Sequence, residues 1–298
     1  MGACTIHPAG QQADVAKISF KSVTKIFGEK PERAFGMIAE SASKEEIRAQ
    51  TGCTLALDKV SLEIPPGRIF AVMGLSGSGK STLLRIVNRL IEPDRGDVLI
   101  DGRSVLGLDA SALIELRRSK VSMVFQSFAL FPHKTVEDNV SYGLTLGSLS
   151  RKEIHTRVER WIEMVGLGGY SNAYPHELSG GMQQRVGLAR ALATDPEILL
   201  MDEPFSALDP LIRREMQDQL LCLQGDLKKT IIFITHDISE ALRLGDMIAI
   251  LRDGQVMQSG TPRNILQKPA NDHVRAFVGT VSELPLTIAS KTHVSRKN

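Results

Sequence analysis

Residues 74–82 read GLSGSGKST, and this stretch decides the fold. A short apolar run at residues 68–73 leads into it, and residues 81–90 follow with the apolar spacing of a helix. Glycines let successive backbone N–H groups converge on phosphate oxygens, and the positive end of the following helix faces the same phosphates. The stretch predicts a strand–loop–helix unit that binds a nucleoside triphosphate. It leaves the enzyme class open, because kinases, GTPases, helicases and transport ATPases all contain such a loop.

Within this loop, Lys80 is expected to place a cation beside the β- and γ-phosphates, and the Ser81 hydroxyl is expected to bind Mg²⁺. The alternative is a chance glycine–serine turn, which the flanking strand and helix argue against. The residues expected to contact the nucleotide are Gly74, Leu75, Ser76, Gly77, Ser78, Gly79, Lys80, Ser81 and Thr82.

A second chemical signal is the apolar run at residues 198–201, which ends in Asp202 and Glu203. Sheet folds bind ligands at the carboxyl ends of their strands, so these two acids are expected at the nucleotide. Asp202 would hold Mg²⁺, and Glu203 would polarise the attacking water. Either acid alone could belong to an ordinary turn, but together with the phosphate loop they predict an ATPase that hydrolyses its nucleotide.

The third signal is LSGGMQQR at residues 178–185, followed by a helical run that Asp195-Pro196 ends. Ser179 and the N–H groups of Gly180 and Gly181 would lie at a helix N-terminus and form a second anion site. One ATP does not need two such sites from one chain. A head-to-tail dimer resolves this, because each copy could close its second site over the γ-phosphate held by the other. A plain glycine-capped helix start is the alternative.

This stretch resembles the signature of ATP-binding cassette (ABC) transporter ATPases, and other motifs of that family follow in order. Gln126 is similar to the glutamine that senses Mg²⁺ and the membrane partner. SALD at residues 206–209, ending in Asp209, is similar to the loop that joins the two active sites. His236 is similar to the switch histidine at the γ-phosphate. Phe27 is at the position of the aromatic that stacks on adenine, where a core role is the alternative.

The resemblance narrows to the glycine betaine/proline (quaternary-amine) importer ATPases. It rests on the helical insertion at about residues 29–53 and on MGLSGSGKSTLLRIVNRLIEPDRGDVLIDG and FQSFALFPHKTVEDNV. Long members of that group continue into regulatory CBS domains, so a short form without them is expected here. Choline, histidine and proline-type solutes are further candidates for the cargo.

The expected fold is α/β, because short buried strands alternate with helical stretches and so predict a parallel sheet covered on both faces. The resemblance implies a P-loop NTPase with a mostly parallel core sheet, an antiparallel β subdomain and an α-helical signature subdomain at about residues 127–180. We expect flexible tails at residues 1–16 and 281–298 around an ATPase domain at 17–280. Residues 17–27 resemble an edge strand, and Ser43 to Glu46 has capping-box spacing before Gly52.

Composition limits the partners. The net charge is +2, from 36 basic and 34 acidic residues, so no nucleic-acid partner is expected. No apolar run reaches the roughly 18–20 residues of a membrane span, and no secretory signal is expected. The resemblance implies a second copy of the chain, an integral membrane permease and, indirectly, a solute-binding protein. The expected location is the cytoplasmic face of the cell membrane, through the permease.

One local feature bears on the permease. Phe128, Leu130, Phe131 and Pro132 form an apolar stretch after Gln126. We expect these residues to help form the groove that receives a permease loop, since exposed apolar patches are often partner sites. Burial in the core of the helical subdomain is the equal alternative.

The main rival class is a non-transport ABC ATPase acting on DNA, chromosomes or ribosomes. Such proteins need long heptad segments, zinc-binding cysteines or tandem cassettes, and these are missing from the sequence. A binding module without catalysis is a second rival, and intact Lys80, Asp202, Glu203 and His236 argue against it. The expected function is therefore ATP hydrolysis that powers uptake of glycine betaine, choline, proline or a related solute.

Overall fold

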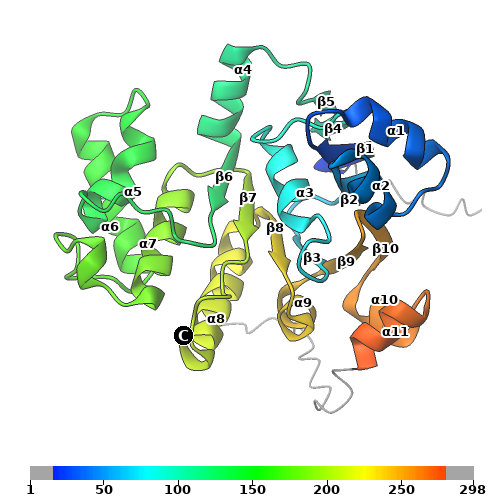
Figure 1. Ribbon diagram of the computed structural model, residues 1–298. Helices are drawn as coiled ribbons and strands as arrows, with labels where there is room; N and C mark the ends of the chain where they lie inside the picture. Colours follow the sequence, from blue (N-terminus) through cyan, green and yellow to red (C-terminus); the bar gives the residue numbers. More distant parts are fainter. Residues whose placement is uncertain (1–15, 280–298) are drawn as a thin grey trace, which may run out of the picture.

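The computed structural model describes residues 16–279, so nearly all of the two predicted tails lies outside the described residues. Figure 1 shows a central sheet with a smaller sheet and two short helices on one side and a group of helices on the other. None of the described helices is both long and apolar enough to cross a membrane.

The central sheet has six strands in the order β10-β9-β3-β8-β7-β6. All neighbours are parallel except β10, which pairs antiparallel with β9. Every residue of β3, β7 and β8 is buried, as expected for strands covered on both faces. The predicted parallel sheet is confirmed, and β10 was missed. The strands are β3 (Ile69–Met73), β6 (Val121–Val124), β7 (Ile198–Asp202), β8 (Thr230–Thr235), β9 (Met247–Arg252) and β10 (Gln255–Gly260).

The smaller sheet is antiparallel, in the order β2-β1-β4-β5, with β1 (Ile18–Phe27), β2 (Thr54–Ile64), β4 (Arg95–Ile100) and β5 (Arg103–Ser104). The prediction of an edge strand at residues 17–27 is wrong, because β1 pairs with both β2 and β4. Register shifts between Phe20 and Thr24, with Ser22 at φ 50°, disturb the alternation of apolar and polar residues. Such bulges make an interior strand look like an edge in the sequence.

The insertion at residues 29–53 is helical as predicted, but it forms two helices, α1 (Pro31–Ala39) and α2 (Lys44–Thr51). Ser41, at φ 63°, breaks the helix between them. Both halves of the Ser43–Glu46 capping box are present, and Gly52 ends α2 in the left-handed conformation. The two helices pack on β1 and β2 through a small core of Ile26, Ala34, Ile47, Cys53 and Leu55.

Two larger cores lie on opposite faces of the central sheet. Ile69, Ala71 and Met73 face one core, while Phe70 and Val72 face the other. This alternation is the strand period of two residues. The first core contains the helices of the signature side, and the second contains the helix after the phosphate loop and the antiparallel sheet. The phosphate loop therefore leaves a strand that is fixed on both faces.

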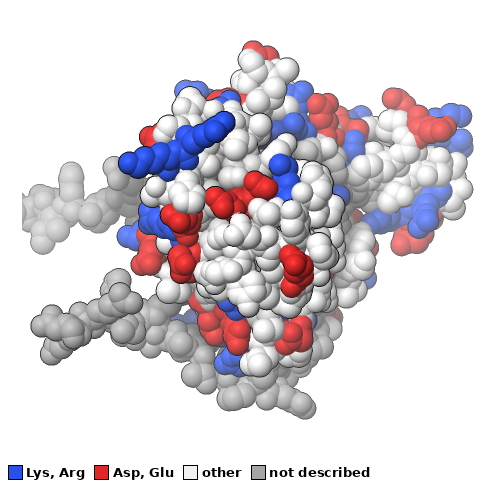
Figure 2. Space-filling view, turned by 90° about the vertical axis from the view of Figure 1, so that its left-hand side faces the viewer, with Lys and Arg blue, Asp and Glu red and all other residues white. Residues whose placement is uncertain are grey.

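The helical group contains α5 (Val136–Thr145), α6 (Arg151–Met164) and α7 (Gly180–Ala193), which pack on one another. Figure 2 shows the face that carries this group, with an uncharged area bordered by charges of both signs. The other helices are α3 (Lys80–Val87), α4 (Ala110–Glu115), η1 (Leu116–Lys120), η2 (Pro175–Glu177), α8 (Pro210–Leu227), α9 (Ile238–Leu244), α10 (Pro262–Gln267) and α11 (Asp272–Gly279).

Candidate functional site

The phosphate loop connects β3 to α3 and is closely surrounded by backbone. A Cβ atom on Gly79 would lie 2.3 Å from the Ala56 carbonyl oxygen, and one on Gly74 would lie 2.2 Å from the Leu251 carbonyl oxygen. Gly79 also has φ 103° and caps α3 without any side-chain hydrogen bond. The first N–H groups of α3 therefore remain available to an anion at its positive end.

Lys80 lies beneath this loop rather than in solvent. Its Nζ donates to the carbonyl oxygens of Gly74 at 2.9 Å and Leu75 at 3.0 Å, and it lies 4.0 Å from Glu203 Oε1. Burial lowers the pKa of Lys80, and the charges of Glu203 and Asp202 oppose that shift. The loop thus holds an ammonium group directly behind its own backbone, where added phosphate charge would favour the protonated form.

Asp202, at the end of β7, is the buried acid of the site, with 2% of its surface exposed. The Ser81 hydroxyl donates to its Oδ1 at 3.0 Å, and Arg85 Nη2 donates to its Oδ2 at 3.0 Å. A carboxylate beside a hydroxyl matches the oxygen ligands that Mg²⁺ prefers. Within residues 16–279 no group of three or more His, Cys, Asp or Glu side chains could hold a metal alone. These two residues fit a Mg²⁺ site that phosphate oxygens and water would complete.

Glu203 and His236 face each other across the ends of two adjacent strands. Glu203 Oε2 lies 3.3 Å from His236 Nδ1. Glu203 has φ 45°, a left-handed conformation that is uncommon for a residue with a side chain. Such backbone strain gathers at functional sites, because the surrounding structure has to hold it. Glu203 thus has Lys80 near one carboxylate oxygen and the His236 imidazole near the other, at the edge where ligands bind in parallel sheets.

Gln126 follows β6 at this same edge. Its Nε2 lies 3.5 Å from Ser206 Oγ, and Ser206 Oγ donates to the Glu203 carbonyl oxygen at 3.0 Å. Asp209 caps α8 by accepting from the N–H groups of Leu211 and Ile212. Gln126 and Ser206, which belong to two separate sequence motifs, thus connect to the backbone of Glu203.

The signature residues lie elsewhere in the same chain. Ser179 caps α7 by accepting from the N–H of Met182 at 3.3 Å, and Ser179 and Gly180 are exposed. A Cβ on Gly181 would lie 2.4 Å from Ile212 Cγ2, so a larger residue there would require the Ile212 side chain or α8 to shift. Figure 1 shows α7 on the far side of β6 and β7 from α3. The structure does not bring this second helix N-terminus to its own phosphate loop.

Phe27 is half exposed, at 42%, and Lys25 Nζ lies 5.4 Å from the centre of its ring. The ring is therefore open to a planar ligand on the surface rather than buried in the core. The phosphate loop contains both exposed and buried residues. Leu75, Ser76 and Gly77 are exposed, whereas Ser78 is buried.

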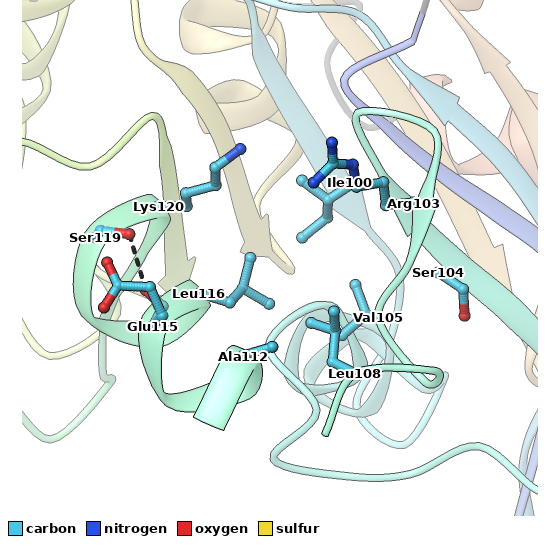
Figure 3. A pocket seen from close by; sticks show the side chains of 10 residues that line it. All are labelled: Ile100, Arg103, Ser104, Val105, Leu108, Ala112, Glu115, Leu116, Ser119 and Lys120. Atoms are coloured by element: carbon cyan, nitrogen blue, oxygen red, sulfur yellow. Dashed lines mark hydrogen bonds between the residues drawn. The ribbon is translucent and has the colours of Figure 1, made fainter. Parts of the chain in front are cut away.

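Two cavities lie near these elements. One of about 430 Å³ adjoins the outer side of the phosphate loop and includes Leu75 and Lys44, whose Nζ donates to the Gly77 carbonyl oxygen at 3.0 Å. The other, of about 210 Å³, has Ile100, Val105 and Leu116 among its lining residues and includes none of the predicted nucleotide contacts. Figure 3 shows its apolar side chains between β5 and η1.

Arg85, Ser206 and Lys44 contact the site, yet sequence reasoning assigned none of them a role. Arg85 had a usable signal, because residues four apart on a helix lie on one face and Ser81 precedes it by one turn. Ser206 lay inside a motif that was read only as a whole. Lys44 had no local signal, since its contact joins two segments that are distant in the sequence.

A comparison with protein-family models matches residues 57–206 to the family described as "ABC transporter". The glycine betaine/carnitine transport ATP-binding protein of Listeria monocytogenes (serotype 1/2a, strain 10403S) is 51% identical over 280 residues, which is 94% of this chain and 70% of that protein. The glycine betaine/proline betaine transport ATP-binding protein of Salmonella typhimurium is 56% identical over 88% of this chain. This chain spans 65% of the length of the Salmonella protein.

Solved structures agree with the fold. A dimeric ATP-binding cassette in a post-hydrolysis state, bound to ADP and Pi, is 36% identical with a TM-score of 0.70, covering 83% of this chain and 99% of that one. Its match extends the similarity from sequence to the arrangement of the strands and helices described above. The family match and the identity to these relatives show that this chain belongs to the ABC transporter family.

Proposed function

We propose that this chain is the ATP-hydrolysing subunit of an importer for a quaternary amine or a related amino acid. The observation that carries the proposal is the cluster of Lys80, Asp202, Glu203 and His236 at one edge of the central sheet. A cation, a ligand for Mg²⁺ and a group that positions or deprotonates water are recurring parts of enzymes that transfer a γ-phosphate, and His236 contacts the last of these, Glu203.

Each predicted group has a role that follows from its position. The backbone N–H groups at Gly79 and the start of α3 would bind phosphate oxygens, and Lys80 would neutralise them. Ser81 and Asp202 would hold Mg²⁺, with Gln126 close by, and the ion would screen the charge of the phosphates. Glu203 would orient and deprotonate water, and His236 would hold that carboxylate in place.

A second copy of the chain is proposed as the first partner. Ser179, Gly180 and Gly181 would bind the γ-phosphate held by that copy, because they lie away from their own phosphate loop. Two exposed apolar side chains support such an interface, namely Leu75 in the loop at 60% and Leu211 after Asp209 at 69%. The similar solved cassette is described as dimeric.

An integral membrane permease is proposed as the second partner, docking near residues 128–132. Phe131 is half-buried and packs on Tyr142 at 4.6 Å between ring centres, and Tyr142 is 39% exposed. Arg190 donates to the carbonyl oxygens of Phe128 at 3.0 Å and Ala129 at 2.8 Å, which orders this segment. Leu130 packs against the core instead, so the apolar stretch divides between core and surface.

The cargo and the location follow from the relatives. Similar proteins are named for transport of glycine betaine, carnitine, proline betaine and, in Pelagibacter ubique, trimethylamine N-oxide. These solutes share a methylated ammonium or amine oxide group. We therefore propose this class of solute as the cargo, taken up with the help of a permease and a solute-binding protein. The chain would then act at the cytoplasmic face of the membrane. Uptake of another amino acid, such as histidine, is the alternative.

The test uses the Glu203→Gln variant of the full chain. It should bind ATP and form a stable dimer in size-exclusion chromatography, while hydrolysis falls by at least about 100-fold. Near wild-type hydrolysis by this variant would contradict the assignment of the base. Proteoliposomes with the co-encoded permease and binding protein should take up labelled glycine betaine only with ATP, and preference for histidine would contradict the cargo.

A further inference from the structure

Arg213, one helical turn after Asp209 on α8, joins two loops of the site. Its Nη2 donates to the Leu208 carbonyl oxygen at 3.1 Å. Its Nη1 lies 3.8 Å from Asp237 Oδ2, and its Nε lies 3.7 Å from Glu240 Oε1. One guanidinium group therefore spans the loop before Asp209 and the residue that follows His236.

Glu240 fixes the far end of this connection. The side chain is buried, with 6% exposed, and accepts from Thr235 Oγ1 at 2.7 Å and from Gln217 Nε2 at 3.2 Å. Thr235 Oγ1 in turn accepts from the backbone N–H of Asp237 at 3.0 Å. Both sequence neighbours of His236 are thus held by groups that contact Glu240 or Arg213.

The connection is incomplete in one respect. The Nε of Arg213 is buried and has no hydrogen-bond partner among the described residues, although Glu240 is its nearest carboxylate. At 3.7 Å the two atoms are too far apart for a hydrogen bond, and an approach of about 0.5 Å would form one. A buried donor without a partner costs free energy, and closing this gap would remove that cost.

We propose that Arg213 is a positioning residue that couples residues 206–209 to His236 through Asp237 and Glu240. This inference rests on the proposed function, in which the second copy contacts exposed Leu211, two residues after the segment 206–209. Docking of that copy would move the Leu208 carbonyl, and the guanidinium would follow it. The loop that carries His236 would then move relative to Glu203, so that hydrolysis at one site depends on the state of the other.

A purely structural role is the competing explanation, because Arg213 also fastens α8 to α9. Loss of a structural contact lowers the melting temperature but leaves the steepness of the ATP dependence unchanged. Loss of a coupling residue lowers that steepness, since cooperativity measures the free energy shared between two sites. The Hill coefficient of ATP hydrolysis therefore separates the two roles.

The test measures hydrolysis against ATP concentration, together with ATP binding, for the full-length wild-type chain and three variants. For Arg213→Gln we expect kcat to fall about tenfold and the Hill coefficient to fall from above 1 to near 1, with the Kd for ATP within about twofold. Arg213→Lys should restore part of kcat, because it keeps the charge without the planar fork. Arg214→Gln, which changes the exposed neighbour on α8, is the matched control and should behave as wild type.

A second variant keeps the test decisive if Arg213→Gln folds poorly. Glu240→Gln should produce the same loss of steepness, and the double variant should be no worse than either single one, because both act through one connection. The inference would be overturned by a wild-type Hill coefficient in either folded single variant. It would also be overturned if the losses of kcat in the two single variants multiplied in the double variant. A wild-type chain that does not hydrolyse ATP would instead overturn the proposed function.

Discussion

The ion pair between Arg85 and Asp202 leads to a prediction about stability that depends on Mg²⁺. The carboxylate is 2% exposed, whereas the Arg85 side chain is 44% exposed. An Arg85→Met variant keeps the apolar stem and the helix propensity but removes the charge that faces Asp202. Without nucleotide, the variant leaves a buried carboxylate with the Ser81 hydroxyl as its remaining side-chain donor.

The magnitude follows from the geometry. A hydrogen bond to a charged group contributes about 1.5–3 kcal/mol, and the solvent exposure of Arg85 reduces this to about 1–2 kcal/mol. For a domain of this size, 1 kcal/mol shifts the melting temperature by roughly 2–4 °C, so we expect a loss of about 2–8 °C. With Mg²⁺ and ATP present the deficit should shrink by at least about half, because the cation would supply the missing positive charge.

Thermal unfolding by calorimetry, with ATP plus Mg²⁺, ATP plus EDTA, or neither, measures these deficits. The matched control is Arg275→Met, which removes an exposed pair with Asp272 and should change the melting temperature by less than about 2 °C. The reasoning is refuted if Arg85→Met is as stable as wild type without nucleotide. It is also refuted if the deficit is the same in all three conditions.

Three further predictions concern single residues. Gly79→Ala should prevent stable folding or ATP binding, because its Cβ would lie 2.3 Å from the Ala56 carbonyl oxygen. The control is Gly36→Ala, whose Cβ would have no neighbour within 4 Å and which should leave thermal stability and ATP binding intact. Phe27→Leu should weaken ATP binding about tenfold in equilibrium titrations while Phe27→Tyr keeps it, and an unchanged Kd in Phe27→Leu would contradict adenine stacking. Burial raises the pKa of Glu240, and the Thr235 hydrogen bond opposes this shift. The group therefore stabilises the folded chain fully at a pH below its ordinary pKa of about 4.5, and this stability is lost as the pH rises through the raised pKa. Urea unfolding should therefore show Glu240→Gln gaining stability relative to wild type as pH rises through that window, and a constant difference would disagree.

Much of the local structure could be predicted, because neighbouring residues determine it. The capping box at Ser43, the left-handed end at Gly52 and the cap at Ser179 each depend on residues within one helical turn. The strand before Gly74 and the helix after it follow from apolar periodicity. The break at Ser41 inside the insertion was not predictable from that periodicity, because a single left-handed residue leaves both helical patterns intact.

The sequence by itself determined the expected chemistry of this protein, because GLSGSGKST, Asp202 and Glu203 contain the backbone and side-chain groups that suit phosphate and Mg²⁺. Only the tertiary structure decided how these groups meet. Strand order placed β7 and β8 side by side, which brought Glu203 within 3.3 Å of His236, and it put β1 between two neighbours rather than at an edge. The packing of α8 set Arg213 between Leu208 and Glu240. Such contacts join segments far apart in the chain, and they depend on crossovers and packing that no local pattern records.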